Sequence, residues 1–275
     1  MQDLRTIKQR MGSIRNIRKI ADAMKMVSTV KYWRLLEQLR KSRTIGEEMK
    51  TFIPPNLLPP TPSKTDEKLT LVLVFFPHRG MCGSLTQNLT QAIAQWYPEA
   101  EHLRFAVFGK KGISAMPAEQ YLRVEQGPVL STESLDHEAV IALARFVAHG
   151  VSSGRFDRVE AVFAEFHNML RQKPERVPLV PLPEPDTEQD IEVDLEPDPA
   201  TLHQLFLPLY LECQLRRVVY ECMVSEHAAR MTAMDNASKN AQELLENFRL
   251  EYNKIRQSKI TLELMEIISG SEAMQ

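Results

Sequence analysis

The C-terminal part of the chain, from about residue 200 to residue 268, most constrains the fold. After Pro208 it contains no proline, and it contains no glycine until Gly270. Its apolar residues recur every three or four positions, which is the spacing of a heptad seam, and such a seam requires a partner to bury it. The seam residues are Met234, Ala237, Ala241, Leu244, Phe248, Tyr252 and Ile255. One helix of this length would extend roughly 100 Å, far more than a globular core needs.

The partner that fits this seam lies at the other end of the chain. Residues 3–50 contain no proline, and their apolar positions also recur every three or four residues. These positions are Leu4, Ile7, Met11, Ile14, Ile17, Ala21, Met24, Ser28, Tyr32, Leu35 and Leu39. Two long helices from opposite ends, each with one apolar stripe, most simply pack as a long antiparallel coiled coil. The alternative is two separate amphipathic helices lying on a central domain, but helices this long would extend beyond such a domain.

Between the helices, the sequence indicates a small central α/β, Rossmann-like domain. Strands and helices alternate along this part of the chain, as in a layered α/β domain. We expect strands at residues 69–76, 103–108 and 158–166, an edge strand at 172–182, a half-exposed strand at 191–195, and helices after residue 84 and at 134–148. Ser84 is an expected helix cap, as is either Asp198 or Thr201.

The expected organisation has four parts, because a cluster of prolines between residues 54 and 62 cannot continue the first helix. These parts are a coiled-coil helix (1–50), a proline-rich linker (51–68), the α/β domain (69–199) and a second coiled-coil helix (200–275).

The net charge is close to neutral, but the charge is unevenly distributed. Residues 1–50 hold thirteen Lys and Arg against five Asp and Glu, whereas acidic residues alternate through residues 184–198. A basic helix could meet an acidic protein surface or a nucleic acid, or it could simply be solvated. No apolar run reaches the length of a membrane span. The three cysteines are an odd number without metal-ligand spacing, which favours free thiols in a reducing compartment.

The best candidate for catalysis is the loop that holds His78, Arg79 and Cys82, directly after the first expected strand. Sites of α/β domains lie at the carboxyl ends of strands, and a thiol beside His and Arg could be activated. However, no carboxylate partner is evident nearby in the sequence, and a small residue in a glycine-rich turn has a simple packing explanation. Residues 150–155 lack the spacing and the lysine of a phosphate loop. We therefore expect no catalytic residue, no cofactor and no metal site.

Two polar clusters interrupt the long C-terminal helix. Residues 225–231 interleave charged side chains with alanines, and residues 256–264 are polar where the seam is otherwise apolar. From composition alone, both clusters are expected on the surface, because most charge on a helix is solvated.

Several motifs resemble the gamma subunit family of F-type ATP synthases. In the first helix the motif is IRKIADAMKMVS at residues 17–28. In the last helix the motifs are SEHAARMTAMDNA at 225–237 and YNKIRQSKITLELMEIISG at 252–270. The loop RGMCG at 79–83 matches the loop after the first strand of the family's middle domain. His78, Ser84 and Leu262 differ from the family pattern, which has an acid, a glycine and a glutamine at these positions.

This resemblance implies a central rotor shaft. The helix pair would stand inside a ring of alpha and beta subunits, and the α/β domain would meet an epsilon-type subunit and the membrane ring of c subunits. The shaft itself would be non-catalytic, would bind no nucleic acid, and would couple ion flow to ATP synthesis or hydrolysis. It would be peripheral at the cytoplasmic face of a bacterial inner membrane, rather than mitochondrial or plastid. By motif position, the residues that would contact the beta subunits are Met24, Lys25, Arg230, Gln257, Thr261 and Glu263.

Two readings from the residues compete with this one. A basic coiled coil that binds nucleic acid or acts as a scaffold fits the charge of the first helix, but aromatic residues interleaved with that charge for stacking are few. A thiol enzyme built on Cys82 fits the loop after the first strand. Co-purification with alpha and beta subunits, or with nucleic acid, would separate these readings.

Overall fold

The computed structural model describes residues 4–51, 69–98, 102–116, 125, 127–128, 130–182 and 198–272. It divides the chain into two compact units. One, the helical unit, combines Met1–Val27 with Met231–Gln275, and the other, the sheet unit, is Ser28–Arg230. Most of the expected linker and the expected strand at 191–195 lie outside the described residues.

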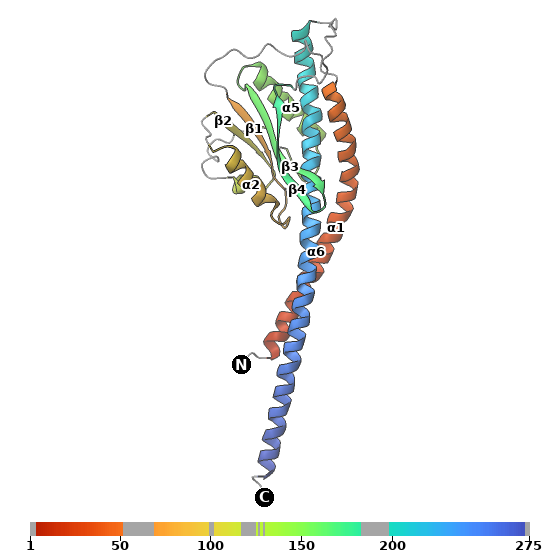
Figure 1. The fold of residues 1–275 in the computed structure, drawn as a ribbon, viewed down its shortest axis with the longest axis vertical. Coiled ribbons are helices and arrows are strands. Elements are labelled where there is room, and N and C mark those ends of the chain that lie inside the picture. Colours follow the sequence, from red (N-terminus) through yellow and green to blue (C-terminus); the bar gives the residue numbers. More distant parts are fainter. Residues whose placement is uncertain are drawn as a thin grey trace. The chain divides into compact units, whose positions relative to one another are not determined.

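Two long helices dominate the chain, as the seams predicted (Figure 1). They are α1 (Leu4–Thr51) and α6 (Pro199–Glu272). The start of α6 follows the usual rules for a helix N-terminus: proline is its first residue, and Asp198 Oδ2 accepts a hydrogen bond from the Thr201 amide at 3.1 Å. Of the two expected caps, Asp198 is therefore the one used.

In the helical unit, α1 and α6 pack antiparallel. Polar pairs join the two helices at regular intervals. Partners further along α1 lie further back along α6, as antiparallel packing requires. The pairs are Arg18–Gln242, Asp22–Ser238 at 2.6 Å and Lys25–Asp235 at 2.5 Å. Between the pairs, small and apolar residues such as Ala21 and Ala241 are buried. The predicted antiparallel coiled coil is confirmed.

Two of the predicted seam positions are wrong. Leu244 is 48% exposed, whereas its neighbour Leu245 is only 2% exposed. Ile17 is also exposed, and Arg18 takes the inward position instead. The mean spacing of the seam was correct. However, a mean between three and four residues does not determine where a step of three and where a step of four occurs. Only the partner helix shows which of two adjacent residues points inward.

Among its described residues, the sheet unit contains four strands in the order β2-β1-β3-β4. The first three run parallel, and β4 pairs antiparallel with β3 at one edge. Their bounds are Thr70–Phe75 for β1, Leu103–Phe108 for β2, Arg158–Asn168 for β3 and Arg171–Val180 for β4. The prolines of β4 fit an edge, where missing amide donors are tolerated. The predicted α/β domain is therefore confirmed.

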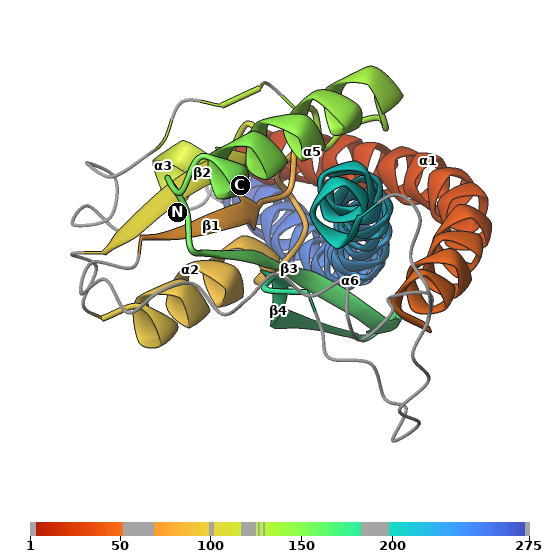
Figure 2. The same cartoon turned by 90° about the horizontal axis from the view of Figure 1, so that it is seen from above.

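Helices cover both faces of this sheet (Figure 2). The alternating side chains of β1 divide between the two faces, as expected for a buried parallel strand. Leu71, Leu73 and Phe75 pack with α5 (His137–Ser152) and with the sheet unit's part of α6. Val72, Val74 and Phe76 pack with α2 (Leu85–Trp96). A short helix, α3 (Gly112–Ala115), lies after β2.

A smaller core joins the sheet unit's part of α1 to α6 and to the end of β3. Tyr32, Leu36 and Leu39 of α1 pack there with Phe166 of β3 and Val224 of α6. The Tyr32 ring meets the Phe166 ring edge-on, with 5.7 Å between the ring centroids. Within the sheet unit, α1, α6 and the sheet thus share apolar contacts.

The expected Ser84 cap is wrong. Ser84 precedes α2, but its side chain makes no capping hydrogen bond to that helix. Instead, the Ser84 Oγ accepts a hydrogen bond from the Asn88 side chain at 3.3 Å. By contrast, Asp136 caps α5, and its Oδ1 accepts from the amides of Glu138 and Ala139.

Candidate functional site

Two segments of α6 carry four of the six predicted contact residues: Arg230, Gln257, Thr261 and Glu263. The inner segment is residues 221–230, which belongs to the sheet unit, and the terminal segment is residues 257–268, which belongs to the helical unit.

The loop after β1 passes directly over the inner segment. The Glu226 carboxylate accepts hydrogen bonds from the backbone amides of His78, at 2.6 Å, and Arg79, at 3.3 Å. Glu226 is only 4% exposed. A buried carboxylate requires such donors, because water cannot supply them. The loop backbone therefore solvates the charge of Glu226.

Arg230 completes this arrangement from one helical turn further along. Its guanidinium donates to the carbonyl oxygens of Gly80, at 3.2 Å, and Arg79, at 3.1 Å, and it lies 2.5 Å from Glu226 Oε1. Arg230 is 3% exposed. Glu226 thus binds the loop's amides and Arg230 binds its carbonyls. We call this pair with its loop contacts the Glu226–Arg230 clamp.

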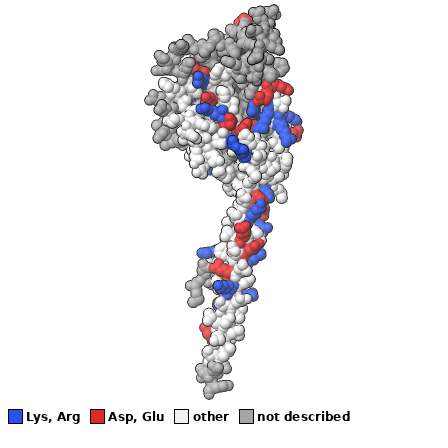
Figure 3. All heavy atoms as spheres, in the orientation of Figure 1, with Lys and Arg blue, Asp and Glu red and all other residues white. Residues whose placement is uncertain are grey.

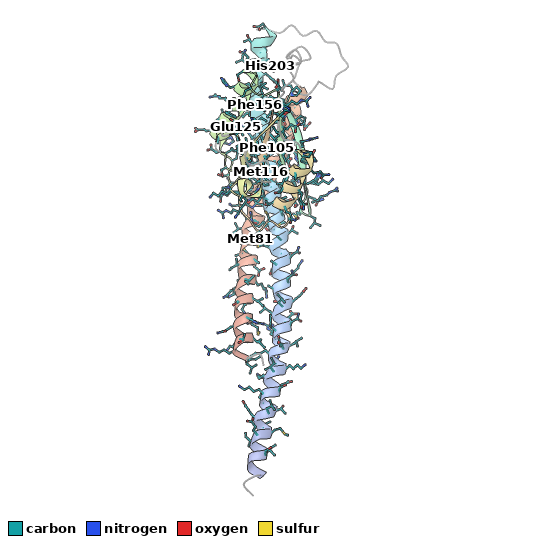
Figure 4. The ribbon with its side chains drawn as sticks, turned by 90° about the vertical axis from the view of Figure 1, so that its left-hand side faces the viewer. Met81, Phe105, Met116, Glu125, Phe156 and His203 are labelled. Atoms are coloured by element: carbon teal, nitrogen blue, oxygen red, sulfur yellow. The ribbon has the colours of Figure 1, made fainter. Side chains whose placement is uncertain are left out.

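The clamp holds a loop with unusual backbone angles. Met81 has φ 61° and Gly83 also has φ 61°, both in the left-handed region. This region is uncommon for a residue with a side chain. The Met81 side chain is 61% exposed. In Figure 4, Met81 and His203 lie at the two ends of the sheet unit.

A second ion pair fastens the inner segment to β3. Arg43 of α1 reaches both carboxylate oxygens of Glu221, at 2.6 and 2.8 Å. The amide of Phe166 donates to Glu221 Oε2 at 3.0 Å, and Arg43 donates to the Phe166 carbonyl at 2.8 Å. Ser225 Oγ donates to the Ala164 carbonyl at 2.8 Å. The inner segment therefore bonds to the carboxyl-terminal parts of both β1 and β3.

Residues 225–231 are predicted on the surface. This prediction is wrong for residues 225–230, which belong to the sheet unit. Ser225, Glu226, His227 and Arg230 are all buried. The composition of the cluster is that of a solvated helix face, but each charge has a partner on the loop or on its own helix. The predicted contact of Arg230 with a beta subunit stays a prediction.

The inner segment also holds a histidine with a perturbed pKa. Burial, reinforced by the positive charges of Arg230, Lys31 and Arg79, lowers the pKa of His227 to about 4. Its imidazole is therefore neutral at pH 7.

Cys82 lies in a different environment from the one a reactive thiol needs. Burial raises the pKa of its thiol, and the charge of Glu226 raises it further, against the opposing effects of Thr86 and Arg230. A neutral, buried thiol is a poor nucleophile. No carboxylate is evident near Cys82 in the sequence, but the fold brings Glu226 to this loop, and its charge opposes thiolate formation.

The terminal segment is the opposite case. Every residue from 256 to 269 is exposed, including Gln257, Thr261 and Glu263, as the sequence predicted. Thr261 Oγ1 donates to the Gln257 carbonyl at 3.0 Å, a bond within the helix. The exposed large apolar residues are Ile260, Leu262, Leu264, Met265, Ile267 and Ile268. Thr261, Glu263 and Glu266 stand between them, and exposed large apolar residues gathered in this way are typical of a surface for a partner.

Met24 and Lys25 lie on α1 within the helical unit. Both are partly buried, and Lys25 pairs with Asp235 of α6. Hydrogen bonds from Lys239 and then Lys25 lower the pKa of Asp235 to about 2. The six predicted contact residues therefore do not form one compact site: Arg230 belongs to the sheet unit and the other five to the helical unit.

The charged residues that fasten α6 were missed by the sequence reasoning, although a signal was present. Glu221 and Glu226 stand in the sequence VVYECMVSEHAA, which is apolar or small on every side of the helix. A helix that is apolar all round is buried, so a carboxylate within it must be paired. The partners could not be read from the sequence, because Arg43 and residues 78–80 are far away along the chain.

The surface carries charges of both signs. Figure 3 shows Lys and Arg side by side with Asp and Glu over both units on the face in view. The basic excess of α1 is partly offset by α6, since Lys25 pairs with Asp235 and Arg43 with Glu221.

In the part of the chain that the structure describes, no cluster of three or more His, Cys, Asp or Glu side chains could hold a metal ion. None of the described helices has a stretch apolar and long enough to cross a bilayer.

Comparisons with known proteins agree over nearly the whole chain. A family model described as ATP synthase matches residues 3–274. The ATP synthase gamma chain of Geobacter sp. (strain M21) is 33% identical over all of both chains. That of Chloroflexus aurantiacus (strain ATCC 29366 / DSM 635 / J-10-fl) is 32% identical, over all of this chain and 99% of its own length.

Solved structures share the fold at lower identity. A chain of the Euglena gracilis mitochondrial ATP synthase (OSCP/F1/c-ring) has a TM-score of 0.71 at 21% identity, covering 98% of this chain and 94% of its own. A chain of the Tetrahymena thermophila mitochondrial ATP synthase (central stalk and c-ring) has a TM-score of 0.62 at 22% identity, covering 80% and 99%.

Proposed function

Since the chain belongs to the ATP synthase gamma chain family, we propose that it is the central rotor shaft of an F-type ATP synthase. In this role it transmits rotation between ion flow through a membrane ring and the making or hydrolysis of ATP in a catalytic ring. The chain itself performs no bond chemistry. It carries a coupling free energy between two distant sites.

The observation that best supports this role is the form of the helical unit. An antiparallel helix pair joined by apolar contacts and polar rungs resists bending, and its end presents an apolar surface on the terminal segment. A shaft needs both properties: a stiff body, and an end that turns inside a surrounding protein surface without forming fixed polar bonds.

The proposed partners follow from the family and from the complexes to which the similar structures belong. The helix pair stands within a ring of alpha and beta subunits, and the sheet unit meets an epsilon-type subunit and the ring of c subunits. The complex lies at the cytoplasmic face of a bacterial inner membrane, with this chain as a peripheral part of it.

The proposed contacts with the beta subunits are Met24, Lys25, Arg230, Gln257, Thr261 and Glu263. Exposure supports this proposal best for Gln257, Thr261 and Glu263, which are free of packing within the helical unit. Lys25 and Arg230 already have partners within the chain, so a contact with a beta subunit would compete with or extend those bonds.

Assembly and ion pumping test this proposal. The chain is co-expressed with alpha and beta subunits and the membrane parts of the enzyme, and ATP hydrolysis and ion pumping are measured in the purified complex. We expect the chain to co-purify in the complex and the complex to pump ions, while a complex expressed without the chain does not pump. The isolated chain should hydrolyse no ATP. ATP turnover at enzymic rates by the isolated chain would overturn the proposal, as would pumping by a complex that lacks it.

A further inference from the structure

The topology of the sheet unit places the usual ligand position of a common fold type next to α6. β1 lies between β2 and β3 and is parallel to both. The chain therefore reverses its direction across the sheet at β1, and ligands of such sheets bind outside the carboxyl ends of the strands at this reversal. In this chain, side chains of α6 occupy that position.

The Glu226 carboxylate has the bonds that a bound anion would have there. It accepts from two successive backbone amides of the loop after β1, and an arginine pairs with it. Successive amides in a turn form a concave anion site, and arginine is a common partner of anions. Glu226 is thus an internal ligand that attaches α6 to the loop.

This attachment differs mechanically from the apolar core around it. The hydrophobic effect is non-directional, so the buried apolar area does not by itself select one angle of α6 on the sheet. A hydrogen bond weakens steeply when its distance or angle changes. The Glu226–Arg230 clamp therefore resists rotation and sliding of α6 against the sheet, which the apolar contacts alone resist less.

A second attachment prevents the helix from pivoting about the first. Glu221 is bound by Arg43 of α1 and by the amide of Phe166 at the end of β3. The two carboxylates lie five residues apart on α6; Glu226 binds the loop after β1, and Glu221 binds the end of β3. Together they fix both the position and the angular setting of α6 on the sheet.

We propose that the Glu226–Arg230 clamp, supported by the Glu221–Arg43 pair, is the device that passes rotation from the sheet unit into α6. Glu226 and Arg230 are then positioning residues for coupling. This inference rests on the proposed rotor function and assigns a part of that function to named side chains.

The test compares coupling in assembled complexes. Glu226→Gln keeps the shape of the side chain but removes its charge and one acceptor. The matched control is Glu212→Gln on the same helix, whose carboxylate pairs with Arg216 one turn away and not with the sheet. ATP hydrolysis and ATP-driven ion pumping are measured for each complex, and the readout is ions pumped per ATP hydrolysed.

We expect Glu226→Gln to retain hydrolysis while the ratio of ions pumped to ATP hydrolysed falls about fivefold, the lower end of typical coupling between sites. Glu212→Gln should match the parental ratio. A change in folding alone would reduce the yield of complex but would leave the ratio per assembled complex unchanged. A parental ratio in Glu226→Gln, or an equal loss in Glu212→Gln, would overturn the inference.

A second variant covers the case in which Glu226→Gln does not assemble. The double variant Glu226→Gln with Arg230→Gln leaves no unpaired buried charge, which is the main cost of the single change. It is expected to assemble and to show the same lowered ratio, and a parental ratio, or failure of the double variant to assemble, would overturn the inference. If the parental complex itself does not pump, the proposed rotor function fails, which distinguishes the two failures.

Discussion

The inner and terminal segments of α6 both mix charged with apolar residues, but their environments are opposite. In residues 221–230 the charged side chains are buried and bonded to the sheet unit. In residues 257–268 the large apolar side chains are exposed along with the polar ones. One continuous helix thus buries its charges in one segment and exposes its apolar residues in another.

This contrast shows that a side chain's polarity does not determine its burial when the surroundings differ. A buried charge is tolerated where backbone amides and an opposite charge replace water. An exposed apolar surface is tolerated where a partner covers it in the working assembly. In this molecule the first condition is met within the chain, and the second is expected to be met by other subunits.

The largest expected effect concerns arginine in the inner segment. Arg230→Ala would leave Glu226 buried without its opposite charge, and we expect the free energy of unfolding to fall by about 3–5 kcal/mol. Gln257→Ala in the terminal segment should change it by less than about 0.5 kcal/mol, because that side chain is exposed. Urea unfolding of the two variants, followed by circular dichroism, measures both. Equal free energies of unfolding for the two variants would show that the buried ion pair contributes no more to stability than the exposed glutamine.

The next prediction concerns the apolar seam of α6, at positions between the inner and the terminal segment. Leu245→Ala should lower the free energy of unfolding by about 2–5 kcal/mol, because Leu245 is buried against α1 in the helical unit. Leu244→Ala, one position away, removes an exposed side chain and should cost no more than about 0.5 kcal/mol. Thermal unfolding of both variants reports the difference, and a larger loss for Leu244→Ala would restore the seam first read from the sequence.

A smaller effect should appear as pH dependence. The pKa of His227 falls from 6.5 to about 4 on folding. Below pH 6.5, His227 of the unfolded chain therefore binds a proton, whereas His227 of the folded chain stays neutral. The free energy of unfolding therefore decreases as the pH falls from about 6.5 to about 4. The full loss corresponds to about 3 kcal/mol.

His227→Gln removes this titration and should flatten that part of the stability profile. His149→Gln changes an exposed histidine and serves as the control. Unfolding free energies measured between pH 4 and pH 7.5 give the comparison; a parental slope in His227→Gln would show that the buried segment does not exclude the proton.

The smallest effect is expected at Cys82, in the loop that the inner segment holds. Its thiol is buried and its pKa is raised, so it has no thiolate to contribute at neutral pH. Cys82→Ser should therefore leave ion pumping and ATP hydrolysis of the assembled complex unchanged. A loss of pumping with normal assembly would indicate a chemical role for the loop.

Much of this protein follows from its sequence alone. Two proline-free stretches with spacing near 3.5 predicted α1, α6 and their antiparallel pairing, because a long apolar stripe has few other ways to be buried. A continuous apolar run at residues 69–76 predicted a central strand covered on both faces. The motifs in α6 identified the family, because long patterns of specific residues rarely recur by chance.

Only the tertiary structure decided which polar residues are buried. Periodicity describes one helix at a time, so it could not distinguish Leu244 from Leu245, or reveal that residues 78–80 and Arg43 meet Glu226 and Glu221. Those contacts join positions more than a hundred residues apart. The burial of a charge depends on donors that such distant segments supply, and it therefore becomes determined only when the sheet, its loops and the helices pack together.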